Sequence, residues 1–93
     1  MNKQAAQECV NREISELRAR SYDELLKLVK TPESKWAEGP DGKRYGLEAN
    51  AVYESGRGSK RSKHLLVMVA VDDGGWRTVT GSFIIAPDGT VEP

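Results

Sequence analysis

The nine residues HLLVMVAVD at positions 64–72, which run directly into DGG at 73–75, decide the fold of this chain. Every position from Leu65 to Val71 is apolar, and we predict a strand at 64–72. Asp72-Asp73-Gly74-Gly75 predicts a hairpin after it, because Asp and Gly tolerate the positive φ of a tight hairpin turn. This stretch therefore predicts the centre of an antiparallel sheet.

The segments on both sides of this strand alternate apolar and polar side chains, which is the period of a half-buried strand. The strand before it, at about 44–54, has an apolar face of Tyr45, Leu47, Ala49, Ala51 and Tyr53. The strand after it, at 76–86, has Val79, Gly81, Phe83 and Ile85 on one face. A short strand at 35–38 precedes the turn GPDG at 39–42, and a brief edge pairing is expected at 90–91 after Pro87-Asp88-Gly89. Such short connections predict antiparallel neighbours in sequence order.

The first third of the chain is helical. Residues 1–31 contain no Gly or Pro, whereas residues 32–93 contain all nine Gly and all four Pro. A stripe of apolar residues at helical spacing is formed by Ala6, Val10, Ile14 and Leu17. Ser21 and Glu24 make a capping-box sequence, and Pro32 ends the helical region. We predict two helices, at about 3–20 and 22–30, and one continuous bent helix is the alternative.

These elements predict a single α+β domain over residues 1–93, in which a helical segment at 1–31 packs on one face of a four-stranded antiparallel sheet at 33–93. The helical stripe should pack over Leu47, Ala49, Val67, Val69, Val79, Phe83 and Ile85. This element order is similar to that of the cystatin-like folds and the larger nuclear-transport-factor-like folds. The cystatin inhibitors carry a Gln-x-Val-x-Gly hairpin that this sequence lacks, so the similarity does not imply protease inhibition.

Composition narrows the function classes. Ninety-three residues suit one small domain, and the net charge of zero argues against binding nucleic acid through the overall field of the protein. Cys9 is the one cysteine, so an intrachain disulfide is impossible. No stretch approaches the roughly 20 apolar residues of a membrane span. We therefore expect a cytoplasmic protein that does not use a membrane.

No constellation of residues predicts catalysis. His64 is the one histidine, and nothing in the sequence places it beside the Cys9 thiol. Two such residues are too few for the usual four-ligand zinc site, and the hairpin turn explains Asp72 and Asp73. We expect no enzymatic activity, no cofactor and no metal.

Half of the apolar residues in the sheet face away from the predicted helices. If Val67 and Val69 face the helices, the opposite face carries Val52, Leu66, Met68, Ala70, Trp76 and Ile84. An apolar surface of several hundred Å² is usually an interface or a ligand surface. We expect self-association, most simply a two-fold homodimer, or binding of a protein partner. The alternative is that sheet twist or the C-terminal segment covers these residues.

The segment at 57–64 is the second candidate site, because it concentrates four cations: Arg57, Lys60, Arg61 and Lys63. Such a loop could hold the phosphate of an anionic ligand or of nucleic acid. No aromatic residue is interleaved there, so base stacking is not supported. The alternative is a solvated loop whose charges keep the neighbouring strand ends from pairing with other chains.

Overall fold

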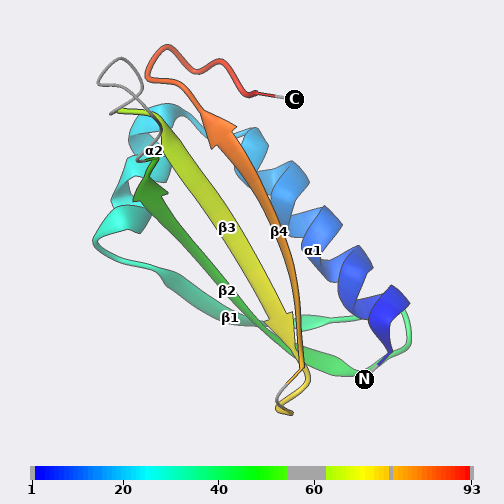
Figure 1. The fold of residues 1–93 in the computed structure, drawn as a ribbon. Helices are drawn as coiled ribbons and strands as arrows, with labels where there is room; N and C mark the ends of the chain where they lie inside the picture. The colour runs from blue at the N-terminus through cyan, green and yellow to red at the C-terminus, as the bar shows by residue number, and fades with distance from the viewer. Residues whose placement is uncertain (1, 55–62, 76, 93) are drawn as a thin grey trace.

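A computed structural model of the chain describes residues 2–54, 63–75 and 77–92. Helix α1 spans Lys3–Arg18, helix α2 spans Tyr22–Leu26, and one turn of 3-10 helix, η1, spans Lys27–Val29. The strands are β1 Glu33–Glu38, β2 Arg44–Tyr53, β3 Leu65–Asp72 and β4 Thr78–Ile85. They form one antiparallel sheet in the order β1-β2-β3-β4 (Figure 1). The predicted α+β class and the meander topology are confirmed.

The chain turns sharply between α1 and α2, and side-chain caps fix that break. The Ser21 hydroxyl accepts a hydrogen bond from the Glu24 amide at 3.2 Å, while the Glu24 carboxylate accepts from the Ser21 amide at 3.4 Å. This is the capping box expected from the sequence. The two-helix interpretation is therefore confirmed, and the alternative of one continuous helix is wrong.

Three strands begin away from their predicted positions, and β3, which starts at Leu65, differs by one residue. Strand β1 starts at Glu33, two residues before its predicted start, because Glu33 already pairs with Ala49 of β2. Strand β4 starts at Thr78, and Trp76, at which it was predicted to start, lies outside the described residues. The expected pairing near residue 90 is present as a single bridge between Ile85 and Val91.

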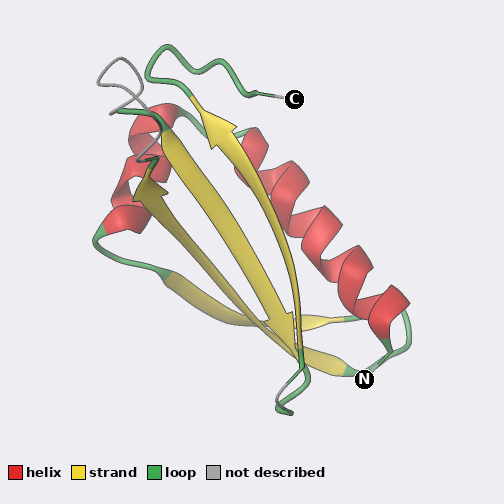
Figure 2. Ribbon diagram, viewed as in Figure 1, coloured by secondary structure: helices red, strands yellow, loops and turns green. Residues whose placement is uncertain are grey.

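Both helices lie on the same side of the sheet (Figure 2). Helix α1 packs over β3 and β4, and η1 packs over β2. The core between the layers consists of Ala5, Ala6, Cys9, Val10, Leu17, Leu25, Leu28, Tyr45, Leu47, Ala49, Ala51, Leu65, Val67, Val69, Val71, Phe83 and Ile85. It contains most of the residues expected on the inward faces of the strands, but Tyr53, predicted on the apolar face of β2, is 51% exposed at the end of that strand. Ile14 and Val79 pack against this core but are only partly buried.

Helix α1 packs directly against the backbone of β4 at Gly81. A Cβ atom at Gly81 would lie 2.6 Å from Val10 Cγ1 and 3.5 Å from Ile14 Cγ1. The absence of a side chain at this position therefore lets Val10 rest on the backbone of the strand.

The other flank of α1 is tied to β1 by polar contacts. Glu13 Oε1 lies 3.0 Å from Lys35 Nζ, and Arg20 Nη1 lies 2.9 Å from Glu33 Oε2. Arg12 also donates to the backbone carbonyl of Glu38 at 3.3 Å. Glu13 is only 4% exposed, so Lys35 compensates a carboxylate that the packing has removed from water.

Within the ranges that the structure describes, no helix has the length and apolar character needed to cross a lipid bilayer.

Candidate functional site on the open sheet face

The sheet face opposite the helices has no described helix or strand packed on it (Figure 2). We call it the open face. Strand register arranges its side chains in rows across β2, β3 and β4. From one end of the sheet to the other, the rows are Val52-Leu66-Ile84, Asn50-Met68-Ser82, Glu48-Ala70-Thr80 and Gly46-Asp72-Thr78. The face therefore changes from apolar at one end to polar and acidic at the other.

The structure brings together five of the six residues predicted for an interface. Their strand positions place Val52, Leu66, Met68, Ala70 and Ile84 on the open face, and we call this group the apolar patch. Val52 is 45% exposed, whereas the other four are partly buried by their neighbours within the sheet. The sixth predicted residue, Trp76, lies outside the described residues.

A depression lies in the middle of the open face. It has a volume of about 270 Å³, and its lining includes Glu48, Asn50, Met68, Thr80 and Ser82. The Asn50 Oδ1 atom is buried here and has no hydrogen-bond partner among the described residues. A buried acceptor without a donor costs free energy, so a donor supplied by a binding partner would stabilise the complex.

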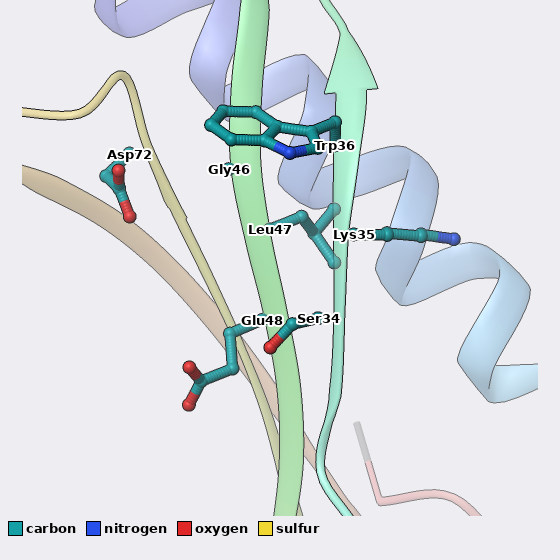
Figure 3. A pocket seen from close by; sticks show the side chains of 7 residues that line it. All are labelled: Ser34, Lys35, Trp36, Gly46, Leu47, Glu48 and Asp72. Carbon is teal, nitrogen blue, oxygen red and sulfur yellow. The ribbon is translucent and has the colours of Figure 1, made fainter.

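The polar end of the open face contains a second, shallow pocket (Figure 3). The indole of Trp36 lies across β2 at Gly46, and the side chains of Ser34, Glu48 and Asp72 surround the remaining space. The pocket has a volume of about 360 Å³. Trp36 is 64% exposed, and the Arg44 guanidinium lies 5.2 Å from the centroid of its ring, a cation–π contact.

The sequence did not place Trp36 at this site. The four residues of the predicted strand at 35–38 alternate too briefly to show which face is buried. The strand register shows which face each residue lies on. Lys35 lies opposite the buried Leu47 and so faces the helices, whereas Trp36 lies opposite Gly46 and so faces away from them.

The two reactive side chains lie at opposite ends of the sheet. Cys9 is buried near Tyr45 at the start of β2, whereas the carbonyl of His64 accepts from the Glu54 amide beyond the end of β2. Ten strand residues span about 33 Å, so the thiol and the imidazole do not meet. No group of His, Cys, Asp and Glu within the described ranges could hold a metal ion.

The basic segment is mostly outside the described residues, including Arg57, Lys60 and Arg61. Lys63 is described and exposed, and its backbone carbonyl accepts a hydrogen bond from the Tyr22 hydroxyl at 2.6 Å. This bond ties α2 to the start of β3 and does not itself indicate a ligand. Anion binding by this segment stays a prediction.

Among the described residues, the titratable group with the largest pKa shift is Tyr45, which lies at the start of β2 beside the β1–β2 turn and away from the open face. Tyr45 is buried on the helix side, and its hydroxyl donates to Asp41 Oδ2 at 2.6 Å. This hydrogen bond, together with burial, raises the pKa of Tyr45 to about 12, and it lowers the pKa of Asp41. The pair anchors the turn and lies outside both pockets of the open face.

Comparison of the chain with protein-family models, with curated proteins and with solved structures finds no match. Function must therefore be argued from the geometry of the site.

Proposed function

We propose that this protein is a non-enzymatic interaction protein whose open face binds a protein surface, most simply the open face of a second copy. The observation that carries the proposal is the apolar patch, over which no described element packs, beside the unpartnered Asn50 oxygen. Burial of apolar area is the main driving force of protein association. A partner would cover the patch and could supply the missing donor.

The anatomy of the open face suits a protein partner better than a small molecule. Protein interfaces combine apolar and polar area, as this face does from its apolar end to its polar end, and small ligands prefer concave sites that enclose them. Trp36 and Arg44 add two residue types that are enriched among energetically dominant interface residues. Four strands that average eight residues project an area of roughly 500 Å², which corresponds to a small protein interface.

Substitution of Met68 by Asp tests this proposal, because it places a charge in the middle of the apolar patch. The matched control is Gln4→Asp, which adds the same charge at an exposed position of α1. Light scattering at high micromolar concentration should give a mass above that of one chain for the wild type and the control, and a lower mass for Met68→Asp. Circular dichroism should show that all three proteins are folded.

A wild-type protein that stays monomeric at that concentration would contradict self-association through the open face. The same variants then test a different partner by affinity capture from native lysate. A partner retained by Gln4→Asp and lost from Met68→Asp would support the open face as its binding surface. Equal capture by both variants would overturn the proposal.

A further inference from the structure

The outer edge of β4 presents unpaired backbone groups along most of its length. The amide of Glu92 donates to the carbonyl of Ile84 at 2.8 Å, so the backbone groups of Ile84 point away from β3. In an antiparallel strand every second residue points to the same side. The amides and carbonyls of Thr78, Thr80 and Ser82 therefore also point outward, and no other described segment pairs with them.

The two edges of the sheet differ in how they are protected. Proteins usually guard an edge strand with charges, proline or a bulge, because an unguarded edge pairs with other chains. Strand β1, ESKWAE, carries three charged side chains and is further tied to α1 by Lys35 and Glu33. Strand β4, TVTGSFII, contains no charged residue and no proline. Only its last residues are covered, by the bridge between Ile85 and Val91.

We infer that the β4 edge pairs with the β4 edge of a second copy, antiparallel and about a two-fold axis at Thr80, to give one continuous eight-stranded sheet. This interface is distinct from the open face, and it does not depend on the function proposed above. The C-terminal segment selects the register, because it occupies the edge from Ile84 onward. With the axis at Thr80, Thr78 of one copy meets Ser82 of the other, and the pairing ends where that segment begins.

The side chains near this axis are suited to the contact. On the open face, Thr80 lies beside its own symmetry mate, and such Thr–Thr pairs across strands stabilise a sheet. On the helix side, Val79 of each copy lies opposite Gly81 of the other, which leaves room for the valine. Val79 and Ile14 pack against the core yet stay partly exposed at this edge. A fifth strand would cover both of them.

The helices can accommodate the pairing. Helix α1 packs over both β3 and β4, so its axis lies about half a strand spacing inside the edge. Two copies joined at β4 would place their α1 helices about 10 Å apart, within the range of packed helices. Gln7, Asn11, Ile14 and Arg18 follow one another at helical spacing, and Ile14 contacts Gly81, so this stripe faces the β4 edge. Its central residues are uncharged, so two antiparallel copies meet there without like charges.

Amide hydrogen exchange measured by NMR tests the inference residue by residue. At high protein concentration, the amides of Thr80 and Ser82 should exchange about tenfold or more slowly than at a concentration where the chain is monomeric. The outward amides of β1, at Ser34 and Trp36, should not change. Exchange of Thr80 and Ser82 as fast as that of Ser34 and Trp36 at every concentration would overturn the inference.

Proline substitutions give a second test with a matched control. Thr80→Pro removes an outward N–H and leaves the ladder with β3 intact, and Ser34→Pro makes the same change on the β1 edge. The dimer should be lost in Thr80→Pro and retained in Ser34→Pro. If either proline variant fails to fold, Thr80→Lys and Ser34→Lys replace them, because Thr80→Lys places two ammonium groups opposite each other at the axis.

These outcomes separate the two interfaces. Association that survives Met68→Asp and disappears in Thr80→Pro would support the edge and contradict self-association through the open face. Association that survives Thr80→Pro, with unprotected Thr80 and Ser82 amides, would overturn the edge pairing whatever Met68→Asp does.

Discussion

Gly81 is the residue on which the packing of α1 against the sheet depends. Val10 is buried and β-branched, so it has little freedom to move away from an added methyl group. Gly46 is the other glycine within a strand of the described sheet, and it faces a different environment. A Cβ there would meet its nearest neighbour, Asp72 Oδ1, at 3.5 Å, which is an ordinary contact.

Gly81→Ala should therefore lower the free energy of unfolding by about 1–3 kcal/mol, the usual cost of overpacking a core. Gly46→Ala is the matched control and should change stability little, since its new methyl group has room. Urea denaturation followed by circular dichroism measures both values. Equal stability of the two variants would show that α1 can shift away from β4 without cost.

Tyr45 predicts a dependence of stability on alkaline pH. Its pKa is raised to about 12 in the folded protein, whereas an unfolded tyrosine titrates near pH 10. Between these values the folded chain retains a proton that the unfolded chain releases, so stability should fall as pH rises from about 10 to 12. In Tyr45→Phe this part of the decline should be absent when chemical denaturation is compared at matched pH values. An identical slope in both proteins would contradict the Tyr45–Asp41 hydrogen bond.

Side-chain parity was predictable residue by residue, and individual polar partners were not. Alternation in 44–53 correctly placed Leu47 inward, and the period of two in the uniformly apolar 65–72 correctly separated Val69 from Met68 once Val69 was taken to face the helices. Glu13 carries a charge and would be expected in solvent, yet it is buried because Lys35 of β1 reaches it across the layers. Such a pair depends on how the helix is placed on the sheet, and a local sequence pattern does not predict that placement.

At the scale of elements, the break between α1 and α2 was the most predictable feature. The capping box is a local interaction between residues three positions apart, so the sequence contains all of it. The start of β1 was less predictable. Glu33 follows Pro32 and becomes a strand residue because β2 pairs with it and Arg20 binds its carboxylate. Both partners are distant in the chain.

Ser21→Ala should remove the hydroxyl that accepts from the Glu24 amide and should lower stability by about 1 kcal/mol, the typical cost of losing an N-cap. Glu24→Gln is the control, since glutamine can also make the reciprocal bond of a capping box. Thermal unfolding of the two variants and the wild type gives the comparison. A Glu24→Gln variant as unstable as Ser21→Ala would mean that the charge of Glu24, and not the capping geometry, holds the break.

At the scale of the whole molecule, the two proposed interfaces are geometrically compatible. The edge contact uses an axis perpendicular to the sheet, and the face contact uses an axis parallel to it. Where the two axes intersect, they generate a closed tetramer, in which two eight-stranded sheets face each other.

A chain that uses both interfaces with itself should therefore be a tetramer, and each single variant, Met68→Asp or Thr80→Pro, should be a dimer. The double variant should be a monomer. Sedimentation velocity on the four proteins at equal concentration measures this series. A double variant that still associates would point to a third surface and would contradict the assignment of both interfaces.

The open face could be predicted from the sequence, but the free length of the β4 edge could not. The face follows from the alternation of Leu66 and Met68 with Val67 and Val69, which is a property of one strand. Short connections already predicted β4 as an edge strand, but its free length depends on which backbone groups point outward and on where the C-terminal segment pairs, as at Ile85 and Val91. Those facts arise only when the whole sheet is assembled.

The unequal protection of the two edges limits how many copies of the chain can add to the sheet. A sheet with two adhesive edges can add copies at both ends and lengthen without limit, as fibrils do. Here the charged β1 edge offers no equivalent site, so a pair joined at β4 presents only guarded strands to the solution. Addition of further copies along the sheet then stops at two, and the chain can expose an adhesive strand without becoming a seed for polymerisation.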